Sequence, residues 1–589
     1  MRLVVIARLD SQVWHSKAVR FDWPSSREAQ TASCIPRGLQ IVCEARLDRR
    51  ADLARTLGSS TSLTDAELLL ESYARWGPDC VGHIDGEFAL AVCDNRQRRI
   101  FAARDRFGVR PCYYAICGNR VIVSSNAALI AGLCGTVVSD SAIAKYLVAH
   151  TGQVEETFFV GVRRLPPASI LIVDHLGCVV RRYWQLDART SRRSASGLGD
   201  ELRSLLIESV CARIPPKGPY GSMLSGGLDS SAITGIAAKH AANRAVHAFT
   251  FVHSRAQQAD ERRYARAFVD SHRQICWSIV DGSDLLAVCS PAPASQPSHA
   301  PNLAVTLAMY EAARARGLAV LLDGFDGDSV ISHGTRRLLE LLAGGKLSEF
   351  WREITAVARA RELSQWAALK LLVLRPLAPI AFRRLVARAR SAQHDENAAL
   401  LAPRLRALAP APPVQPIARS EAARHMQLLS APSIGRTLEL LDEAAGAHGI
   451  EPRYPFFERR LVELCVTIPA ALKLHGGQTR WLMRRALWEE LSSPIAQRRG
   501  KANLSHVFLA LFSGHHAEFD RWLERIPDSM APYVDRMGFR STYERAKRGN
   551  LRGTLALFRM LALCRWLETV ARVKEPPFSS PINLKSRTN

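Results

Sequence analysis

Residues 225–231 have the composition of a phosphate-binding loop. They read Ser-Gly-Gly-Leu-Asp-Ser-Ser, directly after an apolar stretch that ends at Leu224 and before a helical pattern. The two glycines let the backbone approach a polyanion, and the serine hydroxyls donate hydrogen bonds to its oxygens. The first amides of the following helix face the same anion with the positive end of the helix dipole. The Gly-Lys-Ser/Thr ending of a Walker A loop and the spacing of G-x-G-x-x-G are both absent from this stretch.

A second acidic cluster follows another apolar stretch. Residues 321–328 read Leu-Leu-Asp-Gly-Phe-Asp-Gly-Asp. If both apolar stretches are strands of one parallel sheet, their carboxyl ends lie along the same edge, where ligands bind. Because carboxylate oxygens are suitable Mg²⁺ ligands beside phosphates, this edge is our candidate site.

From about residue 200 onward, the chain alternates strands and helices, which predicts a parallel, doubly wound sheet. Strands are expected up to 224 and at 246–252, 277–280 and 319–323, and helices at 200–213, 230–242, 260–271 and 302–316. Beyond 335 the pattern is helical, with a break expected at 401–416 because its prolines cannot continue a helix.

Residues 1–184 instead predict an antiparallel α+β module. Short β-branched segments occur at 3–7, 39–44, 88–93, 100–103, 121–124 and 170–173, with a helical pattern at 64–76. The polar stretch 187–199 lacks periodicity and is typical of a linker. We therefore expect an N-terminal domain at 1–186, a linker at 187–199, a second domain at 200–575 and a frayed tail at 576–589.

Composition excludes several classes of protein. The 589 residues exceed one domain, and 47% hydrophobic residues exclude a disordered or collagen-like chain. Lys+Arg exceeds Asp+Glu by 79 − 55, a formal net charge of +24, but the basic residues are scattered, so we expect no nucleic-acid partner. The 13 cysteines show no C-x-x-C pair, which indicates neither a zinc site nor a disulfide framework. Since no apolar stretch is long enough for a membrane span, we expect a soluble, cytoplasmic protein without a membrane partner.

The motifs resemble those of the asparagine synthetase family. The Ser-Gly-Gly-x-Asp-Ser pattern is similar to the pyrophosphate loop of ATP pyrophosphatases, and 246–253 with 260–266 resemble the family's adenine strand and following helix. Residues 85–91 and 103–114 resemble its class II amidotransferase module. The stretches 451–458, 478–484 and 498–501 are similar to its R-x-P-F motif, which here contains Arg453, and its late basic segments. The resemblance covers roughly 1–335 and 430–510, while 336–430 matches nothing in the family.

This resemblance implies a fold. The N-terminal part is expected to be an α+β class II glutamine-amidotransferase-like domain, an antiparallel sandwich of the Ntn type. The larger part is expected to be an α/β ATP-pyrophosphatase domain, like the adenine nucleotide α-hydrolases, with helical additions.

The resemblance also implies roles for individual residues. It places Ser225, Gly226, Gly227, Leu228, Asp229, Ser230, Ser231, Phe249, Thr250, Phe251 and Gly324 around ATP and its pyrophosphate. Asp229 and Asp328 are expected to hold Mg²⁺, so that the implied cofactors are ATP and Mg²⁺. Lys501, over the α-phosphate, and Arg480 are the expected catalytic residues.

Departures from the family pattern narrow the expected function. Active members use a cysteine exposed at the N-terminus as glutaminase nucleophile, whereas residue 2 here is Arg, and Cys34 and Cys43 are internal. The ammonia-handling segment is represented only by Cys-Glu-Ala-Arg-Leu-Asp at 43–48. An inactive module beside an intact ATP site resembles β-lactam synthetases and lasso-peptide macrolactam synthetases.

The acidic turn favours the lasso cyclase among these alternatives. Its Asp326-Gly-Asp328 form is closer to lasso cyclases, and Phe325 stands where β-lactam synthetases carry a catalytic Tyr. The expected substrate is a leader-cleaved precursor peptide whose Asp or Glu side chain is adenylated and closed onto the N-terminal amine, with a leader-processing protease as partner. An ammonia-dependent amide synthetase, a β-lactam-synthetase-like cyclase and an inactive binding scaffold remain as alternatives.

Overall fold

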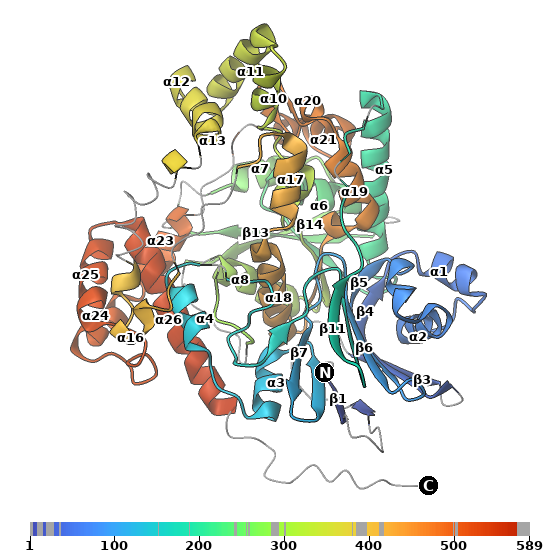
Figure 1. Cartoon of the computed structure of the whole chain (residues 1–589). Helices are drawn as coiled ribbons and strands as arrows, with labels where there is room; N and C mark the ends of the chain where they lie inside the picture. Colours follow the sequence, from blue (N-terminus) through green and yellow to red (C-terminus); the bar gives the residue numbers. More distant parts are fainter. Residues whose placement is uncertain are drawn as a thin grey trace.

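The structure is a computed structural model. It describes residues 4–8, 16–18, 29–34, 37–150, 152–187, 189–191, 193–240, 244–254, 256, 260–283, 294–299, 302–379, 381–383, 397–410, 417–498, 500 and 505–573. They form an antiparallel N-terminal part, a central parallel sheet surrounded by helices, and a group of C-terminal helices (Figure 1). Lys501 and the tail predicted at 576–589 lie outside these ranges.

Two antiparallel sheets make up the N-terminal part, as predicted. One has the order β11-β10-β6-β5-β4-β3 and the other β2-β1-β8-β7-β9. Val42 and Ala91 of the first sheet share a core with Val121 and Val123 of the second, so the sheets pack as a sandwich. The strands are β1 Val4–Arg8, β2 Ser16–Ala18, β3 Gln30–Cys34, β4 Leu39–Leu47, β5 Gly86–Asp94, β6 Arg99–Arg104, β7 Tyr113–Cys117, β8 Arg120–Ser124, β9 Arg163–Arg164, β10 Ser169–Asp174 and β11 Gly177–Arg182.

Four α-helices accompany these sheets: α1 Arg50–Leu57, α2 Asp65–Trp76, α3 Ala127–Cys134 and α4 Asp140–Leu147. The helix expected at 64–76 is confirmed, because Thr64 accepts a hydrogen bond from the Glu67 amide while the Glu67 carboxylate accepts one from the Thr64 amide. Strands β2, β3, β7, β9 and β11 were not predicted. Strand β11 shows why: all of its residues are exposed, so it carries no alternation of apolar and polar side chains.

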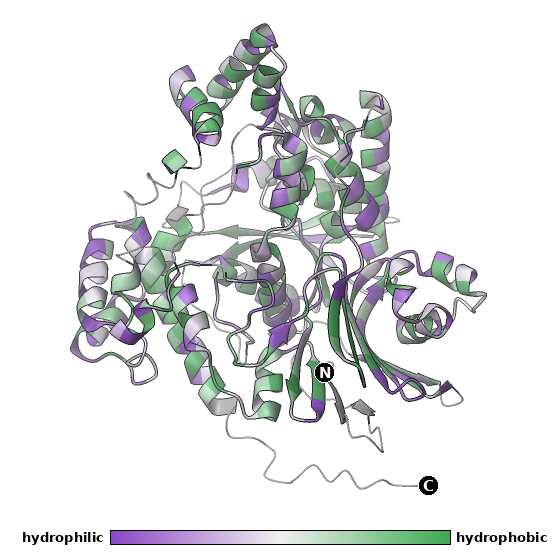
Figure 2. Ribbon diagram, viewed as in Figure 1, coloured by the Kyte–Doolittle hydropathy of each residue, from purple (hydrophilic) through white to green (hydrophobic). Residues whose placement is uncertain are grey.

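The central sheet is parallel, as predicted, in the order β14-β13-β12-β15-β16. Its strands are β12 Gly221–Met223, β13 Val246–Val252, β14 Ile275–Asp281, β15 Val320–Leu322 and β16 Glu451–Arg453. Helices α5 Ala195–Arg213, α6 Leu228–His240, α7 Arg262–Val269, α8 Leu303–Ala315, α18 Pro432–Ala447 and α19 Arg459–Thr467 surround it. The strands are largely hydrophobic, which is typical of a sheet buried on both faces (Figure 2).

Two boundaries differ from the prediction. Helix α5 begins inside the predicted linker, because the Ser194 side chain caps it by accepting a hydrogen bond from the Gly197 amide. The proline stretch 401–416 does not break all helical structure, because Pro403 begins the short helix α16 Pro403–Arg406, where its missing N–H costs nothing.

The remaining chain is helical. Helix α9 Gly327–Ile331 follows β15. The stretch 336–430, which matched no family motif, contributes α10 Arg337–Ala343, α11 Leu347–Ala360, α12 Gln365–Leu369, a π-helical segment Lys370–Leu374, α13 Arg375–Leu377 and α17 Glu421–Leu429. After β16 follow α20 Ala470–Lys473, the hairpin β17 Leu474–His475 and β18 Gln478–Thr479, α21 Trp481–Ala486 and α22 Ser493–Gln497. The 3-10 turns are η2 Gly77–Gly82 and η5 Pro455–Phe457.

The C-terminal helices pack back onto the N-terminal part. They are α23 Ser505–Ser513, α24 His516–Glu524, α25 Arg536–Lys547 and α26 Leu551–Val573. Trp566 of α26 lies in one core with Phe158 and Phe159, and its indole donates to the carbonyl of Ala294. Helix α26 therefore packs against residues that follow α4 of the N-terminal part.

Buried ion pairs join the N-terminal part to the helices around the central sheet. Arg110 donates to Asp442 at 2.9 Å, and Arg164 donates to both oxygens of Glu439 at 2.8 and 2.9 Å. All four side chains are almost fully buried. Since a buried charge is costly without a partner, these pairs fix how the two parts meet.

One cysteine pair differs from the expectation. Cys117, the last residue of β7, is disulfide-bonded to Cys134, the last residue of α3. The sequence showed no disulfide framework because these two cysteines lie 17 positions apart without a recognisable motif.

Candidate functional site

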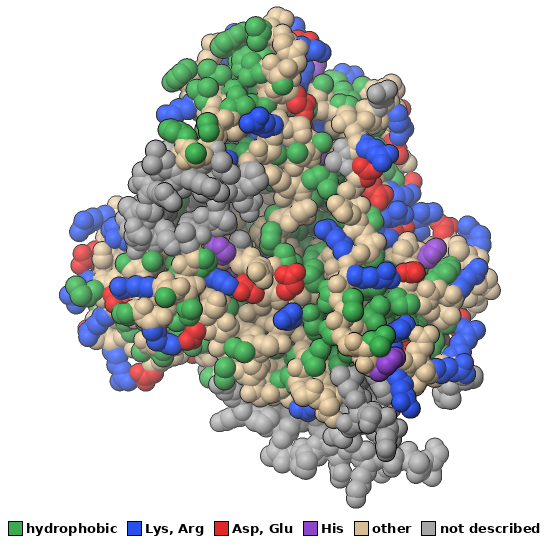
Figure 3. All heavy atoms as spheres, in the orientation of Figure 1, with side chains coloured by type: hydrophobic (Ala, Val, Ile, Leu, Met, Phe, Trp, Pro, Cys, Tyr) green, Lys and Arg blue, Asp and Glu red, His purple; other side chains and the backbone are tan. Residues whose placement is uncertain are grey.

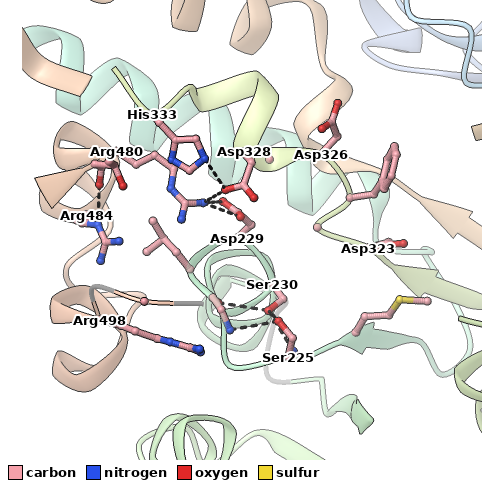
Figure 4. Close-up of a pocket in the computed structure, with 18 of the residues that line it drawn as sticks. Ser225, Asp229, Ser230, Asp323, Asp326, Asp328, His333, Arg480, Arg484 and Arg498 are labelled. Atoms are coloured by element: carbon pink, nitrogen blue, oxygen red, sulfur yellow. Dashed lines mark hydrogen bonds and ion pairs between the residues drawn. The ribbon is translucent and has the colours of Figure 1, made fainter. Parts of the chain in front are cut away.

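A cavity of about 580 Å³ opens at the carboxyl edge of the central sheet (Figure 4). Its volume lies in the range of small-molecule sites. The walls come from the phosphate loop (225–231), from the acidic turn (323–328) after β15, and from residues 477–480 around the end of β18. The fold thus brings together segments that lie about 250 positions apart in the chain.

The phosphate loop is held by its own serines. The Ser225 and Ser230 hydroxyls are 3.0 Å apart, and Ser230 Oγ also accepts a hydrogen bond from the Ser225 amide at 3.1 Å. Gly226 has φ +72°, and a Cβ there would lie 2.8 Å from the Ala265 amide nitrogen of α7. Only glycine fits this position, because both the dihedral and the contact exclude a side chain.

The acidic turn faces the loop through Arg480. Arg480 Nη1 lies 2.8 and 2.7 Å from the two oxygens of Asp229 and 2.5 Å from Asp328 Oδ1. Figure 4 shows the two carboxylates converging on this guanidinium. Burial disfavours the charged form of Arg480, but the two aspartates outweigh it and raise its pKa above the ordinary value.

Two residues of the cavity wall have strained backbones. Asp326 has φ 58° and Arg480 has φ 55°, in the left-handed region that side chains other than glycine rarely adopt. Each costs about 1–2 kcal/mol, and such strain clusters at functional sites. Both residues line the cavity.

Further cationic groups line the cavity. Arg498 donates to the Gly226 carbonyl at 2.7 Å and pairs with Glu261. Its Cζ lies 4.0 Å from the centroid of the Tyr264 ring, so the guanidinium stacks on this ring and holds the loop in place. Burial, helped by Arg480, lowers the pKa of Arg484 to about 10, which leaves it charged at neutral pH. The cavity wall therefore carries both signs of charge, with arginines beside the aspartates of the loop and the acidic turn.

Two titratable groups in the wall are shifted toward their neutral forms. Burial and the nearby Arg480 lower the pKa of His333 to about 4. Burial raises the pKa of Asp323 to about 6. Neither group had a sequence signal beyond its position at or just after the acidic turn.

The structure brings most of the predicted site residues to this cavity and leaves others apart from it. Lining residues are Ser225, Gly227, Leu228, Asp229, Ser230, Gly324, Asp328 and Arg480. Gly226, Ser231, Phe249, Thr250 and Phe251 are not among them. Phe249 and Thr250 are buried in the fold, where Thr250 donates to the Leu224 carbonyl and so ties β13 to the start of the loop.

The two remaining basic residues of the sequence motifs have different outcomes. Arg453 is buried on β16, donates twice to Glu451 at 3.0 and 3.1 Å and contributes nothing to the cavity wall. Lys501 is outside the described residues, although Arg498 and Gly500 beside it line the cavity. Three residues that line the cavity were not predicted from the sequence, because nothing in their local sequence marks them: Thr306 and Met309 of α8, and Arg361 after α11.

Two known families match this chain, one in each of its two parts. The family described as Asparagine synthase matches residues 201–568, which is more than half of the chain. The chain belongs to the asparagine synthase family. A second family, described as Glutamine amidotransferase domain, matches residues 47–184 and covers most of the N-terminal sandwich.

Individual relatives of this chain are distant. Glutamine-hydrolyzing asparagine synthetase 3 of Bacillus subtilis (strain 168) is 32% identical over 248 residues, 39% of this chain and 40% of that protein. Glutamine-hydrolyzing asparagine synthetase 1 of the same organism is 25% identical over 176 residues, 30% of this chain and 28% of that protein. The protein named Amidase chry2 of Gibberella zeae is 28% identical over 192 residues, 32% of this chain and 28% of that protein. The chain thus spans less than half the length of these relatives.

The donor set of the site fits Mg²⁺. Asp229 and Asp328 both reach one Arg480 nitrogen, so their oxygens lie close enough to share a cation. Mg²⁺ is usually held by one or two carboxylates together with phosphate oxygens. No group of three or more His, Cys, Asp and Glu side chains suited to a metal was found among the described residues, so two carboxylates are what the protein offers.

No helix in the described ranges is both long and apolar enough to cross a membrane. Lys and Arg side chains are scattered over the visible face and interspersed with acidic ones, without forming a single basic patch (Figure 3).

Proposed function

We propose that the protein is an ATP-dependent carbon–nitrogen ligase that activates a carboxylate as its adenylate. The observation that carries this proposal is the meeting of the phosphate loop, Asp229, Asp328 and Arg480 in one cavity at the edge of the parallel sheet. In the first step, a substrate carboxylate oxygen attacks the α-phosphorus of ATP and pyrophosphate leaves. In the second, an amine attacks the acyl carbon, an amide forms, and AMP and a proton are released.

The loop would bind the departing pyrophosphate. Its glycines leave the backbone amides accessible, and the amides at the start of the 13-residue helix α6 add the positive end of its dipole. Ser225 and Ser230 supply hydroxyl donors at the same place. Arg498 holds the loop in this form by binding the Gly226 carbonyl.

Asp229 and Asp328 would hold Mg²⁺, which neutralises charge on the phosphates when bound. Arg480, which pairs with both carboxylates, contributes a permanent positive charge beside them. A preorganised cation is worth more here than in water, because the buried guanidinium does not have to reorient during the reaction. We assign Lys501, which lies outside the described residues, to the α-phosphate because the family resemblance implies this role.

The more specific proposal is a macrolactam synthetase that closes a lasso peptide. The family's ammonia-handling segment corresponds to 43–48, and here Arg46 and Asp48 form a buried ion pair at 2.8 Å. Asp48 also pairs with Arg213 of α5 at 3.4 Å, and Arg46 with Glu87 of β5 at 2.9 Å. A route for ammonia has no use for such a charge network, so the amine is expected to arrive with the substrate.

Phe325 supports a peptide cyclase over a β-lactam-synthetase-like enzyme. It lines the cavity and packs against Tyr454 and Phe457, with ring centroids 6.0 and 6.3 Å away. It has no hydroxyl to act in proton transfer. Holding the Asp or Glu side chain and the N-terminal amine of one peptide in the same cavity makes the ring closure local, which accelerates it without a strong base.

The proposed partners are a leader-cleaved precursor peptide and the protease that processes its leader, with the protein in the cytoplasm. The test is to incubate the full-length protein with ATP, Mg²⁺ and a synthetic peptide that carries one Asp or Glu and a free N-terminal amine. AMP, pyrophosphate and a peptide lighter by one water are expected. Formation of ADP would refute adenylation, and AMP without a dehydrated peptide for any acidic core peptide would refute cyclisation.

The names of the relatives favour a second candidate, an ammonia-dependent asparagine-synthetase-like ligase. When supplied with ammonium and a small acid such as aspartate, this enzyme would release AMP in the absence of any peptide. The same assay with ammonium chloride in place of the peptide distinguishes the two.

A further inference from the structure

The stretch 336–430, which matched no motif, supplies the buried polar groups behind the cavity. Two of its carboxylates, Glu421 on α17 and Glu353 on α11, are 2% and 4% exposed. Both bind backbone amides of turns next to the site rather than substrate. Such groups control geometry, because burial makes every one of their hydrogen bonds count.

Glu421 holds the segment that follows the acidic turn. Its carboxylate accepts hydrogen bonds from the Ser332 hydroxyl, from the Gly334 amide at 3.2 Å and from the Arg336 amide at 3.1 Å. Ser332 has φ 63° and Gly334 φ 73°. The strained backbone at Ser332, only four residues beyond Asp328, persists because Glu421 binds the Ser332 hydroxyl and two amides of the turn that follows.

His425, one turn along α17, joins this segment to a second one. Its Nε2 donates to the Val330 carbonyl of α9 at 2.9 Å, and its Nδ1 accepts from Lys473 Nζ at 2.9 Å. Lys473 directly precedes the hairpin β17–β18, and that hairpin leads into Arg480. A fully buried histidine therefore connects the segment of Asp328 with the segment of Arg480.

Glu353 holds the hairpin from its other side. One oxygen accepts from the Gly477 amide at 2.7 Å, and the other accepts from the Gly476 amide at 3.2 Å and from Arg337 at 3.1 Å. Glycine at 477 is required, because a Cβ there would lie 2.4 Å from the Ala356 backbone of α11.

We propose that Glu421, His425 and Glu353 are positioning residues that set the approach of Asp328 and Arg480 to the phosphates of ATP. The proposal rests on the proposed function only in taking ATP as the ligand. The ion pair between Asp328 and Arg480 spans 2.5 Å and involves two segments that share no regular hydrogen-bonded element, so its geometry is inherited from α11 and α17. A charged acceptor removed from either turn lets the pair drift, and Mg²⁺·ATP then binds less well.

The test compares isosteric variants of buried carboxylates. Glu421→Gln and Glu353→Gln each replace a charged acceptor by a neutral one, and Glu443→Gln is the matched control. Glu443 is 5% exposed and accepts from the Ser295 amide at 3.1 and 3.0 Å, but it does not line the cavity. Isothermal titration calorimetry of ATP at graded Mg²⁺ concentrations gives the Mg²⁺ needed for half-maximal binding, and the melting temperature is recorded in parallel.

Both site variants are expected to need about tenfold more Mg²⁺, while Glu443→Gln stays within about twofold of the unmodified protein, although all three lose thermal stability. Equal Mg²⁺ requirements in all four proteins would overturn the positioning role and leave the proposed function intact. Absence of ATP binding to the unmodified protein would overturn both. Should Glu421→Gln fail to fold, Glu353→Gln decides the question by itself, since it acts on the other turn.

Discussion

Replacing Arg480 by Gln tests whether Asp229 and Asp328 share a cation site. In the structure, Arg480 Nη1 contacts three of their four carboxylate oxygens. The variant leaves the two carboxylates facing each other without this positive charge, so the fold is destabilised until another cation takes its place. Gln is chosen because at φ 55° it has the same backbone strain as Arg. Gly would relieve this strain, and the gain in stability would mask the loss caused by removing the charge.

The magnitude follows from burial. Removing one partner of a fully buried ion pair costs about 3–5 kcal/mol. Arg480 is 8% exposed, but the Asp328 side chain is 34% exposed, and solvent screening there reduces the expected loss to about 2 kcal/mol. At roughly 2 °C per kcal/mol, the melting temperature should fall by roughly 4 °C in the presence of a chelator. Mg²⁺ at ten times its dissociation constant should restore about 1.4 kcal/mol of this loss.

The assay is thermal unfolding of the full-length protein with EDTA and with Mg²⁺. Arg485→Gln is the matched control, because Arg485 lies on α21, which begins directly after Arg480, is exposed and stacks on Trp481 at 5.0 Å. We expect Mg²⁺ to stabilise Arg480→Gln more than the unmodified protein or the control. A variant that melts with the unmodified protein in EDTA, or gains no more from Mg²⁺, would refute the shared cation site.

Three further predictions address the loop, the interface and pH. Gly226→Ala should abolish ATP binding, because its Cβ would collide with the Ala265 amide nitrogen. The control is Gly218→Ala, at φ +80° with no atom within 4 Å of its Cβ, which should lose only about 1–2 kcal/mol of stability and bind ATP normally. Calorimetry of ATP binding distinguishes the two variants. Arg110→Met leaves Asp442 buried without its guanidinium and should cost about 3–5 kcal/mol, measured as faster proteolysis between the two parts; unchanged protection would contradict the role of this pair. Burial, together with Lys473, lowers the pKa of His425 to about 3, below the value near 6.5 of an unfolded histidine. The unfolded chain therefore binds more protons between these values, so stability is full above about pH 6.5 and falls toward pH 3 by up to about 1.4 kcal/mol per unit, and His425→Gln should flatten the melting temperature in this range.

The parts of the site that could be predicted from the sequence are local. Ser225, Gly227, Asp229 and Ser230 follow one strand and begin one helix, so residue type and spacing were enough to assign them to a phosphate site. Asp328 could be added because parallel strands end along one edge.

What the sequence could not provide depends on distant packing. Strand β16 is only three residues long and contains Pro452, so nothing marks it before it pairs with β15. Glu421 and Glu353 bind backbone amides of turns far along the chain, and no short-range pattern records such an acceptor. Arg480 was expected to be catalytic, but its link to both aspartates could only be seen once the sheet and the hairpin had formed.

The large excess of arginine also has a physical role that composition does not reveal. Arg104 is fully buried and donates to three carbonyls, those of Gly108, Arg110 and Leu165, at 2.8 to 2.9 Å, while it also pairs with Glu439 of α18. A lysine could not satisfy all of these acceptors, because its ammonium is a compact donor without the planar fork of five N–H groups. Arg110, Arg164 and Arg213 bind acidic groups across the same interface. Part of the arginine content is therefore internal and holds the N-terminal sandwich against the part that contains the central sheet; because these arginines are paired with buried carboxylates, they contribute little to the net charge of +24.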